Sequence, residues 1–152
     1  MSAWRRTEAL QHWVNTVSEE ALEPEVLSAA PDPAISALGR CAALYRQQLE
    51  AANALDFASI QHEALRLLRA YPAIREALRQ RIAYLMVDEY QDTNTVQELI
   101  LLELAHGAAP NLCVEGDDDQ GLYRFRGATI RNILQFKERF APAACPWRCD
   151  GA

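Results

Sequence analysis

The stretch that decides the fold reads IAYLMVDE, residues 82–89. Its first six residues, 82–87, form a short apolar run that stops abruptly at the two acids Asp88 and Glu89. A strand inside a parallel sheet has this pattern, because helices cover both faces of such a sheet and bury the strand. We therefore predict a parallel strand at residues 82–87 and an α/β fold.

The residues after this strand continue the alternation of strands and helices. Residues 94–106 have the pattern of a helix, which Asn94 can cap with Gln97 at the matching capping-box position. Residues 111–114 form a second short apolar strand, and residues 128–140 a final helix. The order strand, helix, strand, helix predicts a parallel α/β layer.

The first eighty residues have helical patterns instead. Apolar side chains recur there at helical spacing, at Leu10, Val14, Val17, Ala21, Leu38, Ala42, Tyr45, Leu49, Ile60, Leu67 and Leu68. Asp32 and Asp56 can cap the helices that follow them, and the pair Tyr71-Pro72 breaks a helix. Residues 1–80 are therefore predicted to form a mostly helical region ahead of the sheet.

The composition is that of a globular domain without a basic excess. The chain has 152 residues, of which 50% are hydrophobic and 24% charged, and its formal net charge is −6. This charge weighs against DNA binding by bulk electrostatics, although it leaves room for a local site. No apolar run approaches the roughly 18 residues of a membrane span, and the N-terminus lacks a signal-peptide pattern. We expect a cytoplasmic protein with no membrane partner.

The two acids at the end of the strand are a weak functional signal by themselves. Open α/β sheets bind ligands at the carboxyl ends of their strands. In a nucleoside triphosphatase of this build, one acid there holds Mg²⁺ and the next activates the attacking water. By themselves, two acids such as Asp88 and Glu89 more often mark a solvated strand end than a catalytic pair, so these two residues leave both interpretations open.

The longer strings around the acids are more specific. Residues 87–94 read VDEYQDTN, and residues 116–128 read GDDDQGLYRFRGA. The first resembles motif II of the UvrD/Rep/PcrA-type superfamily 1 DNA helicases, and the second resembles motif III at this family's spacing. Residues 55–57, LDF, are similar to the family's entry into the helices before motif II. The resemblance covers about residues 45–140. It implies part of a P-loop NTPase (RecA-like) parallel sheet, preceded by a mostly helical insertion subdomain at residues 1–80.

The resemblance also implies roles at a nucleotide site, carried over to the matching residues. Asp88 would be the Mg²⁺ ligand, and Glu89 the catalytic base beside the metal. Gln91 and Asp92 would lie next to the nucleotide, with helix capping as an alternative role for Asp92. Gln120 would sense the γ-phosphate, since a neutral amide can both donate and accept hydrogen bonds. The implied cofactors are ATP and Mg²⁺.

Three further residues would face single-stranded DNA. The aromatic rings of Tyr123 and Phe125 offer stacking surfaces to any base, and Arg126 can meet a phosphate. Without the motif, both aromatic residues would more often belong to the core. With it, the implied activity is ATP-dependent DNA unwinding in the 3′-5′ direction, with single-stranded DNA as the partner.

The sequence lacks the phosphate-binding loop that would complete this site. Such a loop reads G-x-x-x-x-G-K-[S/T] and cradles the phosphates with backbone N–H groups and a lysine. The one lysine of the chain, Lys137, follows Phe136 rather than a glycine. We therefore expect a helicase fragment that is inactive alone. The alternatives are a non-catalytic interaction module and a decayed gene product.

The missing loop has a predicted structural consequence. The resemblance suggests that the strand bearing the loop lies between the strands at 82–87 and 111–114, which would then flank a gap with unpaired backbone groups. We expect a poorly stable or aggregation-prone chain. Residues 81–140 would be part of the first RecA-like ATPase domain. The last twelve residues, 141–152, have no periodicity, and we hypothesise that a shifted reading frame encodes them.

Overall fold

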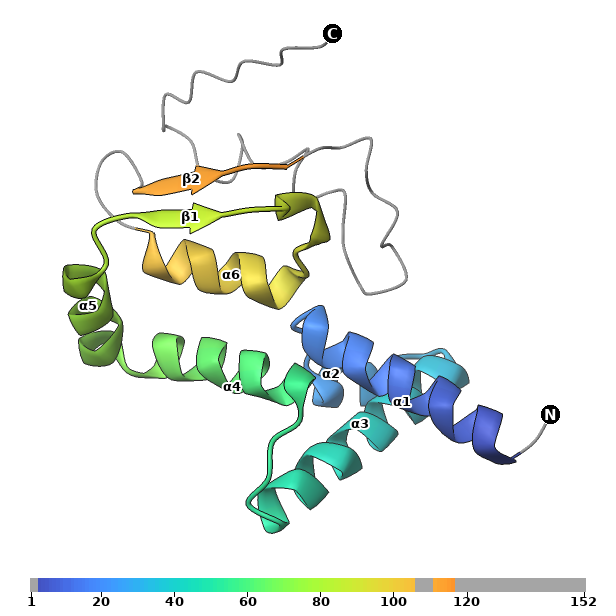
Figure 1. The fold of residues 1–152 in the computed structure, drawn as a ribbon. Helices are drawn as coiled ribbons and strands as arrows, with labels where there is room; N and C mark the ends of the chain where they lie inside the picture. The colour runs from blue at the N-terminus through green and yellow to red at the C-terminus, as the bar shows by residue number, and fades with distance from the viewer. Residues whose placement is uncertain (1–2, 106–110, 117–152) are drawn as a thin grey trace, which may run out of the picture.

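Helices make up the first part of the structure, as the sequence predicts. The computed structural model describes residues 3–105 and 111–116, and its order of elements is shown in Figure 1. The helices before the sheet are α1 (Ala3–Glu19), α2 (Pro24–Ser28), α3 (Pro33–Ala51), α4 (Phe57–Ala70) and α5 (Pro72–Arg81). None of the helices in the described residues is long and apolar enough to cross a membrane.

The predicted helix caps are confirmed. The Asp32 carboxylate accepts hydrogen bonds from the backbone N–H groups of Ala34 and Ile35, at 2.7 and 3.2 Å. Asp56 and Ser59 form a reciprocal capping box at the start of α4. The Tyr45 hydroxyl also donates to Asp56 at 2.7 Å. These contacts satisfy backbone donors that a helix leaves unpaired at its first turn, so they fix where α3 and α4 begin.

The helical core is small, and several of the predicted apolar positions lie outside it, among them Ile60, which is 48% exposed, and Leu67, which is 42% exposed. Val14, Val17 and Ala42 are buried together. Leu10 is 45% exposed, and Ala21 lies beyond the end of α1 with a positive φ of 53°. The placement of Ala21 on a continuous helix was wrong, because the chain reverses there and the N–H of Leu22 bonds back to the carbonyl of Val17.

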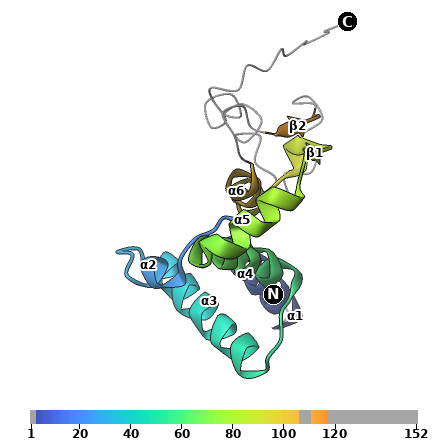
Figure 2. The ribbon, with the colours of Figure 1, turned by 90° about the vertical axis from the view of Figure 1, so that its left-hand side faces the viewer.

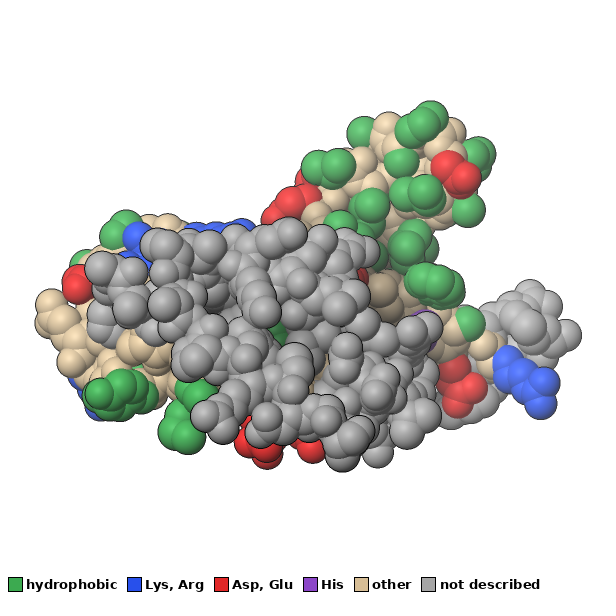
Figure 3. All heavy atoms as spheres, turned by 90° about the horizontal axis from the view of Figure 1, so that it is seen from above, with side chains coloured by type: hydrophobic (Ala, Val, Ile, Leu, Met, Phe, Trp, Pro, Cys, Tyr) green, Lys and Arg blue, Asp and Glu red, His purple; other side chains and the backbone are tan. Residues whose placement is uncertain are grey.

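Apolar side chains remain exposed on the part of the molecule built from α2 and the start of α3. Seen from above, hydrophobic side chains gather on a projecting arm of the structure (Figure 3). Val26 is 71% exposed and Ile35 43%. The described residues therefore give this helical region a shallow core.

Within residues 3–105 and 111–116, the sheet consists of two strands, and these pair directly. β1 (Leu85–Val87) lies parallel to β2 (Leu112–Val114), with Leu85 opposite Leu112. The N–H of Leu85 bonds to the carbonyl of Asn111 at 2.7 Å, and that of Glu115 to the carbonyl of Val87 at 2.8 Å. The predicted gap between these strands was wrong. A crossover through one helix brings consecutive parallel strands side by side, and no intervening strand is needed.

α6 (Thr95–Leu104) connects the two strands and covers one face of the sheet, as the two side-on views show (Figures 1 and 2). Tyr90 is fully buried between them, with Val87, Leu101 and Val114 packed around it. On the other face Met86 is 83% exposed. The parallel α/β arrangement is confirmed, although both strands are shorter than predicted. The helix expected at residues 128–140 lies outside the described residues.

Glu103 ties α6 to the helices before the sheet. Its carboxylate accepts hydrogen bonds from Arg69 of α4 at 3.2 Å and from Arg75 of α5 at 2.7 Å. Its backbone carbonyl accepts one from Arg79 at 2.9 Å. Burial by itself would raise the pKa of Glu103, but the hydrogen bonds and charges of Arg75 and Arg69 hold it below its ordinary value.

Replacing Glu103 with glutamine is expected to destabilise the chain in a pH-dependent way. Because the pKa is lower in the folded state, the carboxylate stabilises the fold above its ordinary pKa near 4, and this contribution is lost as the pH falls further. We expect a loss of about 1 kcal/mol at pH 7. Urea unfolding at pH 7 and pH 3 measures it. An equal difference between the two proteins at both pH values would contradict the ion-pair account.

Candidate functional site

The acids after β1 lie at the carboxyl end of the sheet and are exposed. Asp88 and Glu89 leave the strand in a tight bend, in which the N–H of Glu89 bonds to the side chain of Asp88 at 2.9 Å. Glu89 has left-handed backbone angles, with φ 52° and ψ 44°. That conformation is unfavourable for a residue with a side chain, so the surrounding contacts must hold it.

The side chain of Gln91 holds the carboxylate of Glu89. Gln91 is 2% exposed, and its amide Nε2 donates a short hydrogen bond to Oε2 of Glu89. This bond occupies one carboxylate oxygen. Asp92 lies in the same turn with an exposed side chain. The structure thus brings together four of the site residues that the sequence predicts: Asp88, Glu89, Gln91 and Asp92.

An open hollow of about 420 Å³ lies beside this turn. Polar and apolar side chains both line it, and the lining residues are Val87, Asp88, Glu89, Asp92, Thr93, Gln97, Ile100 and Leu101. Larger or similar hollows occur elsewhere on the described part of the chain, between helices α1, α3 and α4. Among these hollows of the described residues, the one beside the turn contains the predicted acid pair, so we take it as the candidate site.

Tyr90 anchors the turn from below. Its ring is fully buried, its hydroxyl donates to Oε1 of Glu98 at 2.9 Å, and its N–H bonds to the carbonyl of Glu115 at 2.8 Å. Thr93 closes the turn by donating from Oγ1 to the carbonyl of Tyr90 at 2.6 Å. The turn is therefore attached to α6 through Glu98 and to the end of β2 through Glu115.

The cap of α6 is Asn94, as predicted, and not Asp92. The side chain of Asn94 accepts a hydrogen bond from the N–H of Gln97 at 2.8 Å, and the side chain of Gln97 accepts one from the N–H of Asn94 at 3.0 Å. The capping alternative for Asp92 was wrong, because the chain reaches helical geometry two residues later. The exposed carboxylate of Asp92 stays available to the hollow.

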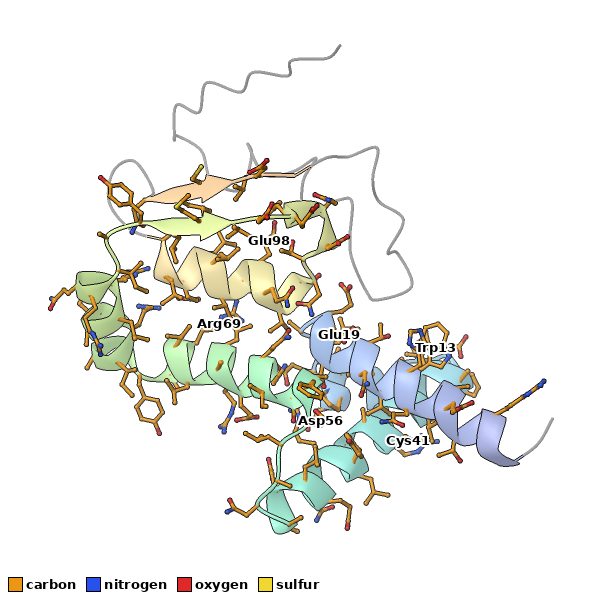
Figure 4. The ribbon with its side chains drawn as sticks, in the orientation of Figure 1. Trp13, Glu19, Cys41, Asp56, Arg69 and Glu98 are labelled. Atoms are coloured by element: carbon orange, nitrogen blue, oxygen red, sulfur yellow. The ribbon has the colours of Figure 1, made fainter. Side chains whose placement is uncertain are left out.

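Sequence reasoning missed Glu98, a completely buried acid that lies between α6 and the sheet (Figure 4). Its signal was present, since residues 95–104 read TVQELILLEL, where Glu98 is followed directly by the apolar run 99–102. An acid buried there needs a hydrogen-bond donor nearby, and Tyr90 supplies one. The remaining predicted site residues lie outside the described residues; they are Gln120, Tyr123, Phe125 and Arg126.

The donor set at the turn fits a magnesium ion carried by a nucleotide. Within the described residues no group of three or more His, Cys, Asp or Glu side chains could enclose a metal ion. Mg²⁺ is usually bound by one or two carboxylates together with substrate phosphates and waters. Asp88 and Glu89 are two exposed carboxylates at the mouth of an open hollow. They suit a shared site of this kind and not a closed protein cage.

These features define the chain as an α/β protein with an acidic site at the carboxyl edge of a parallel sheet. Residues 2–141 match the family model of the UvrD/REP helicase N-terminal domain. The chain belongs to this family.

Two curated relatives illustrate the extent of the similarity. The chain is 46% identical over 102 residues to the ATP-dependent DNA helicase UvrD1 of Mycobacterium tuberculosis (strain ATCC 25618 / H37Rv), a match covering 63% of the chain and 13% of that protein. It is 39% identical over 100 residues to the ATP-dependent DNA helicase PcrA of Bacillus subtilis (strain 168), covering 66% of the chain and 13% of that protein. The chain thus corresponds to a small part of the length of these relatives.

Proposed function

We propose that this chain carries the metal-and-water half of the ATPase site of a 3′-5′ DNA helicase. The observation that supports the proposal most is the exposed acid pair, Asp88 and Glu89, at the carboxyl end of β1 beside an open hollow. The relatives are named ATP-dependent DNA helicases, which agrees with a nucleotide as the ligand of this hollow.

Each residue of the turn has a proposed part in hydrolysis. Asp88 would hold Mg²⁺, which when bound with ATP offsets the negative charge of the phosphates. Glu89 would accept a proton from the attacking water, through the carboxylate oxygen that Gln91 leaves free. Gln91 would keep that carboxylate oriented, and Asp92 would lie beside the nucleotide. Positioning of this kind supplies most of the catalysis in phosphoryl transfer.

The family resemblance supplies the rest of the proposal. Gln120 would sense the γ-phosphate, and Tyr123, Phe125 and Arg126 would contact single-stranded DNA. In this proposal residues 81–140 belong to the first RecA-like ATPase domain, and residues 1–80 form the helical insertion subdomain. The N–H of Tyr90 bonds to Glu115, directly before Gly116 of the second motif, so the two motifs begin at one edge of the sheet.

The 152-residue chain alone is expected not to hydrolyse ATP, because these residues include no G-x-x-x-x-G-K-[S/T] loop to hold the phosphates. The test is ATP turnover by the purified chain with and without single-stranded DNA, beside a Glu89→Gln variant. We expect equal background rates in both proteins. Turnover that disappears in the variant would show an active enzyme and contradict the expectation. Background turnover combined with single-stranded DNA binding would favour a non-catalytic interaction module.

A further inference from the structure

Residues of α4 and of the end of α1 form hydrogen bonds with the start of α6. Oε2 of Glu20, directly after α1, accepts a hydrogen bond from the Thr95 hydroxyl at 2.6 Å. Oε1 of Gln61 in α4 accepts one from the Asn94 side-chain amide at 3.0 Å. The labelled Glu19 marks the end of α1 that approaches α6 (Figure 4). The two contacts thus fall on consecutive residues: Asn94, the last residue of the turn that follows the acid pair, and Thr95, the first residue of α6.

The contact from Gln61 determines which way the Asn94 amide faces. The Oδ1 atom of Asn94 caps α6, and its Nδ2 atom points to Gln61. Asn94 is only 6% exposed. If Gln61 lost its acceptor oxygen, a buried N–H of Asn94 would lose this bond, which typically costs about 1–3 kcal/mol. The cap and the contact between helices therefore depend on the same side chain.

The turn is held at both ends. On the side of the sheet, the N–H of Tyr90 bonds to the carbonyl of Glu115. On the side of the helices, Asn94 and Thr95 are held by α4 and by the end of α1. Glu89 directly precedes Tyr90 and has a left-handed backbone, a conformation that neighbouring contacts must maintain. Loosening either end would release that conformation.

We propose that Gln61 and Glu20 are positioning residues, through which α4 and the end of α1 clamp the turn of residues 88–94 and orient Asp88 and Glu89. The inference rests on the proposed function of this acid pair. It assigns the helical region a role in the geometry of the site. Neither residue touches the hollow itself, since neither lies among its lining residues.

The test compares two substitutions of similar length at Gln61 in the full chain. Gln61→Met keeps the length of the side chain and removes the acceptor, whereas Gln61→Glu keeps an acceptor. Gln47→Met, on an exposed position of α3, is the matched control. Amide hydrogen exchange is followed at Tyr90 and Gln97 and, for reference, at Val17 and Ala42 in the helical core. Paramagnetic broadening of the Asp88 and Glu89 signals by Mn²⁺ reports on the acid pair.

We expect Gln61→Met to speed exchange at Tyr90 and Gln97 about tenfold, as the loss of one buried hydrogen bond implies. Exchange in the helical core should stay unchanged. Mn²⁺ affinity should fall, and Gln61→Glu should restore both properties. Unchanged exchange at Tyr90 and Gln97, equal acceleration at all four positions, or no rescue by glutamate would overturn the clamp. So would Mn²⁺ affinity that is unaltered while exchange at the turn increases.

The proposed function is tested separately within the same experiment. In the parent chain, Asp88→Asn should abolish the broadening by Mn²⁺. If Mn²⁺ broadens neither acid, or does so equally in Asp88→Asn, the metal role of Asp88 is contradicted. The exchange rates then decide by themselves whether Gln61 clamps the turn.

Discussion

Replacing Tyr90 with alanine is expected to unfold the α/β part of the chain while leaving the helical core folded. The Tyr90 ring is fully buried, and Val87, Leu101 and Val114 pack around it. Removing a buried aromatic ring costs about 3–5 kcal/mol, a large share of the roughly 5–15 kcal/mol that stabilises a whole domain. The loss should be local, because Val14, Val17 and Ala42 form a separate core.

Tyr90→Phe is the matched control, because it keeps the ring and removes only the hydrogen bond to Glu98. We expect it to cost about 1–2 kcal/mol. Amide hydrogen exchange at Val87 and Val114, compared with Val17 and Ala42, measures both effects. Equal destabilisation of the two cores by Tyr90→Ala would contradict the local account. So would a phenylalanine variant as damaged as the alanine variant.

The second large effect is expected at Glu89, in a protein that supplies the missing parts of the site. Residues 45–140 of this chain would replace their counterpart in the M. tuberculosis UvrD1 relative. In that chimera, Glu89→Gln should lower the rate of DNA-stimulated ATP hydrolysis by about 10²- to 10⁴-fold, the usual contribution of a general base. Glutamine keeps the size of the side chain and can still meet Gln91, but it cannot accept the proton.

Glu76→Gln provides the control for this substitution. Glu76 lies on α5 with a side chain that is 58% exposed, far in sequence from the turn, and its contact with Arg79 is long at 3.9 Å. We expect this variant to retain the rate of the chimera. A Glu89→Gln rate close to that of Glu76→Gln would contradict the role of Glu89 as the base, provided that both variants fold.

The parts of the structure that local chemistry determines could be predicted from the sequence. The caps at Asp32, Asp56 and Asn94 involve residues two or three positions apart, so their signals are complete within a short window. The position where β1 ends could also be predicted, because the acids Asp88 and Glu89 directly follow its apolar residues. The grouping of Asp88, Glu89, Gln91 and Asp92 came instead from the family resemblance, and the structure has these four residues in one turn.

Contacts between distant segments could not be predicted in this way. The pairing of Leu85 with Leu112 depends on how the connection crosses the sheet, and the expected gap between the strands was wrong. The hydrogen bond from Asn94 to Gln61 joins residues that are 33 positions apart in the sequence. The apolar periodicity of the helices does not predict it. The prediction of poor stability rested on a gap between the strands, and the strands are paired. Apolar surface is still exposed to water on the face of the sheet that carries Met86.

DNA-stimulated ATP hydrolysis by the unmodified chimera tests the central claim most directly, because the relative contributes its own remaining residues and this chain contributes Asp88 and Glu89. Steady-state phosphate release is measured with and without single-stranded DNA. The account predicts DNA-dependent turnover, which falls to background in Asp88→Asn. A chimera that folds and binds ATP but shows no turnover would contradict the claim that this chain holds a working metal-and-water half of the site.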